Sequence, residues 1–193
     1  LTGPGPVIAN GEAGSGPLPL GALLRADGSL DLRSGFTGTL DPSGWVLATG
    51  ADGGPRFLPR SAASPDGARP PGRDAAPETE SAWDPRFPYP GTNGTVNAVA
   101  VVGGQLYVGG DFTEAGGIPV RGLARWDGQG WFDVGGGLST RSTEIDPLVN
   151  ALAVSGDSLI VGGFFTAAGT VDVINLASWD GSSWSPLGGG VGD

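Results

Sequence analysis

Residues 96–137 read VNAVAVVGGQLYVGGDFTEAGGIPVRGLARWDGQGWFDVGGG, and residues 149–190 repeat them as VNALAVSGDSLIVGGFFTAAGTVDVINLASWDGSSWSPLGGG. The two stretches are offset by 53 residues without a gap, and about 24 of the 42 aligned positions are identical. Shared composition alone does not produce this much identity, so the chain contains an internal repeat. A repeat of this length is typical of solenoids, propellers and arrays. The sequence therefore predicts an architecture more clearly than a chemistry.

Each repeat is predicted to form four short strands separated by glycine-containing turns. In the first repeat we expect strands over 97–102, 105–108, 121–126 and 131–134, with a looser stretch over 111–119. Asp-Gly between apolar runs is a strong hairpin signal. Four strands in about 50 residues match the size of one propeller blade. The predicted fold class is therefore all-β, with two propeller-like four-stranded blades and an irregular β-rich, Gly/Pro-rich N-terminal half.

Two motifs give the repeats a family resemblance. Each repeat contains Val-Gly-Gly-x-Phe-Thr-x-Ala-Gly followed by Ala-x-Trp-Asp-Gly-x-x-Trp. The order is similar to a kelch blade, and it resembles more closely a repeat of secreted bacterial propeller-like surface proteins. The resemblance covers about 81–191 and implies a propeller-like fold outside the cell, but no reaction. The residues that carry it are Gly109, Gly110, Phe112, Trp126, Asp127, Gly128, Trp131, Gly162, Gly163, Phe165, Trp179, Asp180, Gly181 and Trp184.

The rest of the chain divides by composition. Turn signals at Asp27-Gly28 and at Asp52-Gly53 each lie between short apolar runs, which predicts two hairpins. Because the chain begins with Leu1 and not with Met, we expect it to be processed. The predicted division is a Gly/Pro-rich arm over 1–20, a hairpin region over 21–60, a Pro-rich linker over 61–81, a lead-in with the first blade over 82–148 and the second blade over 149–193.

The composition excludes several kinds of chemistry. Cys, His, Lys and Met are absent, so the chain has no disulfide, no thiol nucleophile and no imidazole base or metal ligand. A net charge of −10 disfavours nucleic acid and anionic lipid surfaces as partners. No run of about 18 apolar residues is present, so we expect no membrane span. We therefore expect a protein that is not an enzyme and needs no cofactor or metal.

Asp111 and Glu114 are the best candidates for a catalytic carboxylate pair, since they lie three residues apart in one loop. Two carboxylates can act as general acid and base, as in glycosidases. The second repeat carries Phe164 and Ala167 at these positions. A role shared by both repeats is therefore excluded, and solvated loop charges are the favoured interpretation.

Three recurring features admit both a functional and a structural interpretation. Asp127 and Asp180 recur within Trp-Asp-Gly, but a calcium loop needs several converging oxygen ligands, and turn formation explains them. The triple glycines at 135–137 and 188–190 lack the Lys and helix of a phosphate loop, and we expect connectors where backbones pass closely. The four tryptophans of the repeats could stack on sugars, although core positions are favoured.

Two further segments leave alternatives open. The stretch from Trp83 to Pro90 interleaves aromatic residues with proline, which suits either a platform for stacking sugars or peptides, or an apolar lead-in packed under the first repeat. Asn93-Gly94-Thr95 matches the N-glycosylation pattern. It also contains Asn-Gly, a common turn dipeptide, and the turn is favoured.

The number of repeats leads to a functional prediction. A closed propeller needs about four to eight blades, and this chain has two clear ones. Exposed strand edges pair with other chains, and contacts that do not close produce filaments. The N-terminal arm could complete a neighbour's open edge. We predict a secreted bacterial structural protein that polymerises through its arm and open edges into an extracellular filament or surface layer. The alternative is a fragment of a larger propeller that acts as a glycan- or protein-binding adhesion module.

Overall fold

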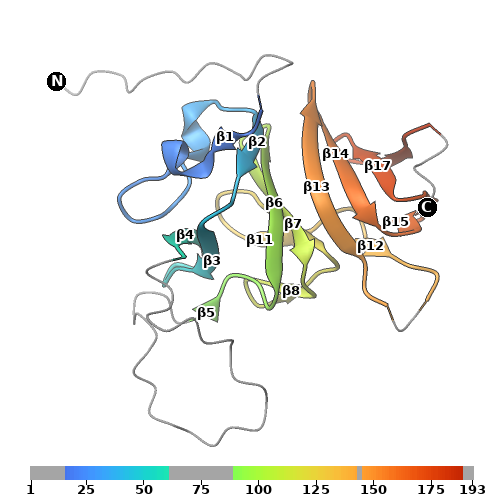
Figure 1. The fold of residues 1–193 in the computed structure, drawn as a ribbon, viewed down its shortest axis with the longest axis horizontal. Helices are drawn as coiled ribbons and strands as arrows, with labels where there is room; N and C mark the ends of the chain where they lie inside the picture. Colours follow the sequence, from blue (N-terminus) through green and yellow to red (C-terminus); the bar gives the residue numbers. More distant parts are fainter. Residues whose placement is uncertain (1–15, 61–88, 143–144, 189–193) are drawn as a thin grey trace, which may run out of the picture.

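The computed structural model describes residues 16–60, 89–142 and 145–188, and these residues form an all-β fold. The only helical segments of this described part are the short 3-10 turns η1 (Leu20–Leu23) and η2 (Leu32–Ser34). Figure 1 shows three layers side by side: an N-terminal unit in blue and teal, the first repeat in green and yellow, and the second repeat in orange and red. The all-β prediction is confirmed.

The first repeat folds as a four-stranded antiparallel meander. Its strands, in chain order, are β6 (Thr95–Val102), β7 (Gln105–Asp111), β10 (Leu123–Trp126) and β11 (Trp131–Asp133). The looser stretch between β7 and β10 forms a small separate hairpin, made of β8 (Glu114–Ala115) and β9 (Ile118–Pro119). The four predicted strands are thus present, with boundaries shifted by a few residues.

The second repeat reproduces this meander strand for strand. Its strands are β13 (Leu148–Ser155), β14 (Ser158–Phe164), β17 (Leu176–Trp179) and β18 (Trp184–Pro186). A small hairpin again follows the second strand, and β12, from the connector between the repeats, joins it. These three short strands are β15 (Ala167–Ala168), β16 (Val171–Asp172) and β12 (Leu138–Ser139). The internal repeat in the sequence is therefore an internal repeat in the structure.

Both repeats carry a β-bulge near the start of their first strand, opposite the second glycine of the Gly-Gly pair. A Cβ atom on Gly110 would lie 1.9 Å from the carbonyl oxygen of Thr95. One on Gly163 would lie 2.0 Å from the carbonyl oxygen of Leu148. Only glycine allows the two backbones to approach this closely, which explains why the second glycine recurs.

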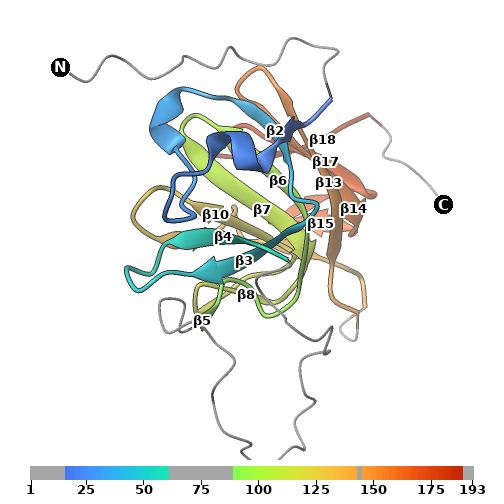
Figure 2. The same ribbon diagram turned by 60° about the vertical axis from the view of Figure 1, so that its left-hand side comes forward.

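The N-terminal unit meets the first repeat in two ways. β1 (Leu18–Pro19) and β2 (Gly38–Asp41) extend the sheet of the first repeat beyond β6. A separate three-stranded sheet consists of β3 (Trp45–Thr49), β4 (Pro55–Pro59) and β5 (Tyr89–Pro90), and Figure 2 shows β3 and β4 in front of the first repeat. The β3–β4 pair is the hairpin predicted around Asp52-Gly53.

The other predicted hairpin, around Asp27-Gly28, is wrong in its strands. A single isolated bridge joins Leu24 to Leu30, and the chain on either side forms η1 and η2 instead. Side chains three residues apart lie on the same side of a 3-10 turn. Leu20 and Leu23 have this spacing and are both buried. Burial of this pair therefore favours a turn over an extended strand.

Two apolar clusters hold the three layers together. One lies between the N-terminal unit and the first repeat, and the other lies between the two repeats. Each repeat presents equivalent positions to the unit before it. These are Val99, Leu106, Val108, Phe112, Val120, Trp126 and Trp131 in the first repeat, and Leu152, Leu159, Val161, Phe165, Val173, Trp179 and Trp184 in the second. We call this face of a repeat its inner face and the opposite face its outer face.

The described sheets are all open, and none closes on itself. β11 and β18 each lie at the edge of a sheet. The predicted arm up to residue 15, the linker over 61–81 and the aromatic stretch from Trp83 to residue 88 lie outside the described residues. The described end of the arm, β1, pairs with β2 of the same chain. The fold is thus a stack of three layers, with the N-terminal unit at one end and the second repeat at the other.

Candidate functional site

The outer face of the first repeat is covered by the second repeat. Figure 1 shows β13 running beside β6 along this contact. The side chains that the contact buries share positions on the outer sides of the strands of the first repeat and the turn after them. They are Ala98, Ala100, Val102, Tyr107, Leu123 and Val134. This contact defines what covers an outer face in this fold.

Three specific contacts fix how the second repeat lies on the first. Gly109 leaves a hollow that Val149 fills, since a Cβ atom on Gly109 would lie 2.5 Å from Val149 Cγ1. Asn97, in the bulge of β6, donates a hydrogen bond from Nδ2 to the carbonyl oxygen of Val149 at 2.9 Å. Trp184 donates from Nε1 to the carbonyl oxygen of Val134 at 3.1 Å. The contact is therefore mainly apolar, with two side-chain hydrogen bonds across it, while Trp179 Nε1 is buried there without a partner among the described residues.

The outer face of the second repeat has the same layout, but no described layer covers it. The equivalent positions are exposed or half-buried, and they are Ala151, Ala153, Ser155, Ile160, Leu176 and Leu187. Gly162, the counterpart of Gly109, keeps its hollow open, because the nearest atom to an added Cβ is a Leu176 methyl at 3.7 Å. Asn150, the counterpart of Asn97, is exposed, and its side chain has no hydrogen-bond partner among the described residues.

Two large apolar side chains enlarge this open face. Phe164 and Ile174 are 44% and 48% exposed. Phe164 is the last residue of β14, and Ile174 lies two residues before the start of β17, the strand that pairs with β14. The first repeat carries Asp111 and Arg121 at the equivalent positions, and both are exposed. The second repeat therefore replaces two charged surface residues by apolar ones on the face that has no cover.

The strands of this face are also uncharged. β13, β14, β17 and β18 contain no Asp, Glu or Arg. The first repeat carries charges within its corresponding strands, at Asp111, Arg125 and Asp133. In a chain with a net charge of −10, an uncharged sheet face is a local exception. We take the outer face of the second repeat as the candidate functional site, with the character of a contact surface.

The predicted carboxylate candidates do not converge. Asp111 and Glu114 are both exposed, and the described residues hold no group of three or more acidic side chains suited to a metal. Asp127 and Asp180 each accept hydrogen bonds from the backbone N–H groups two and three residues later, at 2.8 to 2.9 Å. These backbone bonds lower the pKa of both carboxyls. Both aspartates therefore form turns, as the sequence favoured.

The four tryptophans of the repeats are buried in the two apolar clusters, each 7% or 8% exposed. They pair within each repeat, with ring centroids 5.6 Å apart for Trp126 and Trp131 and 5.1 Å apart for Trp179 and Trp184. The first triple glycine passes close to the pair of the second repeat, since a Cβ atom on Gly135 would lie 2.3 Å from the Trp179 ring and 2.7 Å from Trp184 Nε1. The tryptophans form no exposed stacking platform, and this triple glycine is a connector between layers.

The Asn93-Gly94-Thr95 segment is a turn held by its own asparagine. Asn93 Oδ1 accepts hydrogen bonds from the backbone N–H groups of Thr113 and Glu114, at 2.9 and 3.0 Å. Its Nδ2 donates to Thr113 Oγ1 at 2.8 Å. These three bonds hold the segment as a turn, as the sequence favoured.

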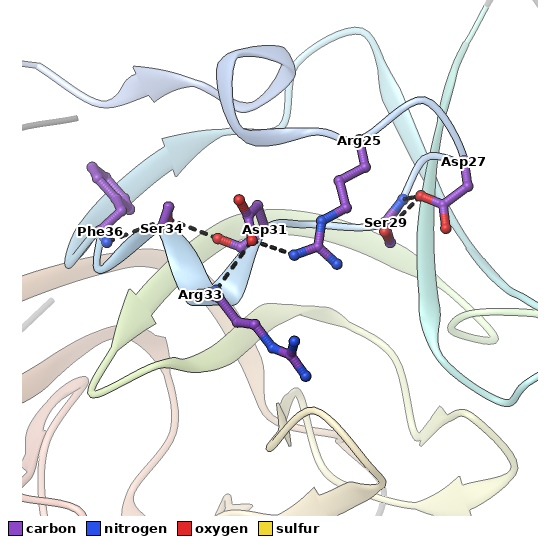
Figure 3. Close-up of polar contacts among 7 residues, drawn as sticks. All are labelled: Arg25, Asp27, Ser29, Asp31, Arg33, Ser34 and Phe36. Atoms are coloured by element: carbon purple, nitrogen blue, oxygen red, sulfur yellow. Dashed lines mark hydrogen bonds and ion pairs between the residues drawn. The ribbon is translucent and has the colours of Figure 1, made fainter. Parts of the chain in front are cut away.

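A groove lies between the N-terminal unit and the turns of the first repeat. This groove has a volume of about 490 Å³ and is lined by charged side chains. Arg25 forms an ion pair with Asp31, and Arg56 forms one with Asp52 at 2.7 Å. Figure 3 shows Arg25 turned toward Asp31, while the guanidinium of Arg33 points away from both. The lining residues Arg25, Arg56 and Asp52 are thus paired within the chain, so the groove supports a ligand less well than the outer face supports a partner.

The importance of the outer face was not recognised from the sequence. There, Phe164 served only to argue against a repeated carboxylate pair. The signal was the pair of differences between the repeats, from Asp111 to Phe164 and from Arg121 to Ile174. Its meaning depends on knowing that both positions are exposed and that no described layer covers this face.

Within the described residues, no helix has the length and apolar character needed to cross a membrane. No protein-family model, no curated protein and no solved structure matches the chain.

Proposed function

We propose that the chain is a structural protein that assembles with copies of itself. In this proposal it is a secreted bacterial subunit of an extracellular filament or surface layer, whose kelch-like, propeller-type blades are completed by neighbouring subunits. The observation that carries the proposal is the open outer face of the second repeat. The same face of the first repeat is buried under a further layer, with its hollow at Gly109 filled and the amide of Asn97 bonded.

The open face also has the composition of a contact surface. Burying apolar surface contributes roughly 25 cal/mol per Å². Contiguous exposed apolar patches on a monomer mark interaction sites, whereas single exposed residues need no explanation. Phe164 and Ile174 are both more than 40% exposed, and the half-buried Leu176 and Ile160 lie on β17 and β14 of the same sheet. A second contact for growth is offered by the edge strands β11 and β18, whose backbone groups can pair with another chain.

A second candidate function has its own supporting observation. The hollow at Gly162 and the amide of Asn150, which has no partner within the described part of the chain, match position for position the features that receive Val149 in the first repeat. A further repeat of the same pattern would fill both. This supports a larger propeller that acts as a glycan- or protein-binding adhesion module.

The proposal is tested by light scattering and electron microscopy of the purified chain over a range of concentrations. The double variant Phe164→Asp with Ile174→Arg restores the residues of the first repeat at two exposed positions, so it should fold normally. Phe132→Ser is the matched control, because Phe132 is 41% exposed, lies under Arg125 on the first repeat, and has Ser185 as its counterpart. We expect the wild type and the control to associate and the double variant to stay monomeric. A wild type that is monomeric at every concentration would contradict self-assembly and favour the larger propeller.

A further inference from the structure

We infer that the outer face of the second repeat binds the same face of a second copy about a two-fold axis, so that stacking stops at a dimer. This inference rests on the proposed function, because it specifies how copies of the chain associate. The partner and the symmetry both follow from which faces of the stack are already occupied.

Head-to-tail stacking needs a free inner face to receive the open outer face. The inner face of the second repeat is buried against the first repeat. The inner face of the first repeat is buried against the N-terminal unit, where Leu20, Phe36 and Phe57 are all less than 5% exposed. The described part of the chain thus offers no free inner face to a neighbour. The N-terminal unit acts as a cap at one end of the stack.

Since the described residues offer no free inner face, the open outer face can instead bind the same face of a second copy. A contact between identical faces is isologous, and it closes after two subunits. A heterologous contact, by contrast, leaves one surface free on each added subunit and continues into a filament. The capped stack therefore yields pairs through this face, and any longer assembly grows through another surface, such as the strand edges.

Charge favours a contact between two open outer faces over a contact through other surfaces of the molecule. Two copies that each carry a net charge of −10 repel one another through most of their surfaces. The strands of the open face carry no charged residue, so two such faces can meet without burying like charges. The position of Phe164 and Ile174 also favours a second copy over a further repeat as the partner of this face. Their counterparts Asp111 and Arg121 stay exposed when a repeat docks in the usual way, so a docked third repeat would leave both apolar residues in water.

The area of the face sets the expected strength. β13 and β14, with eight and seven residues, are about 25 Å long, whereas β17 and β18, with four and three residues, are about 13 and 10 Å long. At a strand spacing of about 4.8 Å, the four strands present roughly 350 Å² per partner. The total of roughly 700 Å² is in the range of weak, transient interfaces. We therefore expect a dimer that dissociates on dilution, with an apparent mass that doubles between low and high concentration.

The chain contains no cysteine, so single-cysteine variants give clean cross-linking. We would place one cysteine at a time on the open face, as Ala151→Cys, Ala153→Cys and Ser178→Cys, with Ser43→Cys on the capped end as control. Sedimentation velocity gives the stoichiometry, and a short bis-maleimide reports which variants link to themselves. We expect a dimer in which at least one open-face variant cross-links to itself, whereas Ser43→Cys does not. Adding Phe164→Asp and Ile174→Arg to that open-face variant should abolish the cross-link.

The outcomes separate this inference from the proposal beneath it. Assemblies in which no open-face variant cross-links to itself would overturn the two-fold contact and leave self-assembly standing. A chain that stays monomeric at every concentration would overturn both. Larger assemblies that retain the self-cross-link would support the inference and place the growth contact elsewhere.

Discussion

The substitution Gly109→Ala should destabilise the protein, whereas Gly162→Ala should not. The two glycines are equivalent in the repeat, and neither requires a left-handed backbone. They differ in what lies above them. An added Cβ at Gly109 would lie 2.5 Å from Val149 Cγ1 and 3.1 Å from its Cβ, whereas at Gly162 the nearest atom is a Leu176 methyl at 3.7 Å. The first separation requires the second repeat to move, and the second is an ordinary contact.

The magnitudes follow from this difference in space. Overpacking a tight contact costs about 1–3 kcal/mol, and Val149 has no room to shift because it is fully buried. At a compatible position, Gly to Ala stabilises by about 0.4–1 kcal/mol because it restricts the unfolded chain. For a chain of 193 residues, each kcal/mol moves Tm by about 2–4 °C. We expect Gly109→Ala to lower Tm by about 2–12 °C, and Gly162→Ala to leave it unchanged or raise it slightly.

Both variants should be measured on the Phe164→Asp, Ile174→Arg background, so that association through the outer face does not contribute to stability. Scanning calorimetry gives Tm, and urea denaturation gives the free energy of unfolding. Equal effects of the two alanines would refute the reasoning. That result would mean that Val149 does not occupy the hollow of Gly109, and the argument from an occupied to an open face would lose its basis.

Three further comparisons test the same architecture. Trp184→Phe removes a buried hydrogen bond between the repeats and should cost about 1–3 kcal/mol, whereas Trp131→Phe removes an Nε1 that has no described partner and should cost less, both by urea denaturation. Asn97→Ala should cost about 1 kcal/mol and Asn150→Ala almost nothing, because only the first amide bonds across the contact. The folded-state pKa of Asp180 lies below its ordinary value of 3.8, so its contribution to stability is present above that pH and is lost on acidification; Asp180→Asn should flatten this dependence below about pH 4 in melts at varied pH.

The repeat could be predicted from sequence because its signals are local. Asp-Gly turns at Asp127 and Asp180, paired glycines and short apolar runs each act within a few residues, and they recur 53 residues apart. Such signals indicate strands and turns without reference to tertiary contacts. The four-stranded meander with its buried tryptophans followed from them.

The N-terminal unit was harder to predict because its form depends on what it covers. Apolar runs around Asp27-Gly28 satisfy the pattern of a hairpin. In the structure, however, Leu20, Leu23 and Leu30 are buried in the apolar cluster that the N-terminal unit shares with the first repeat. Burial against that sheet selects 3-10 turns with a single bridge. Tertiary contacts override local propensity in such short segments. The local sequence of this unit does not indicate that it covers the inner face of a repeat.

The N-terminal unit reproduces only some of the contacts that a repeat makes, so the two ends of the described stack differ. Gly91 accepts a hydrogen bond from the N–H of Gly116 at 2.9 Å, as Gly137 does from Gly169 at 2.8 Å in the contact between repeats. The N-terminal unit thus reproduces one connector bond and the apolar cover. It does not supply a carbonyl oxygen to a tryptophan Nε1, because the Nε1 of Trp131 is buried without a partner among the described residues.

A repeat at this position would supply that carbonyl, as the first repeat does for the second. The N-terminal unit therefore covers the inner face of the first repeat without this carbonyl contact among the described residues. The second repeat, in contrast, ends in a face that keeps the hollow and the amide of an internal repeat. Among the described residues, the inner face of the first repeat is covered and the outer face of the second repeat is not. The proposed self-association through this outer face rests on that asymmetry.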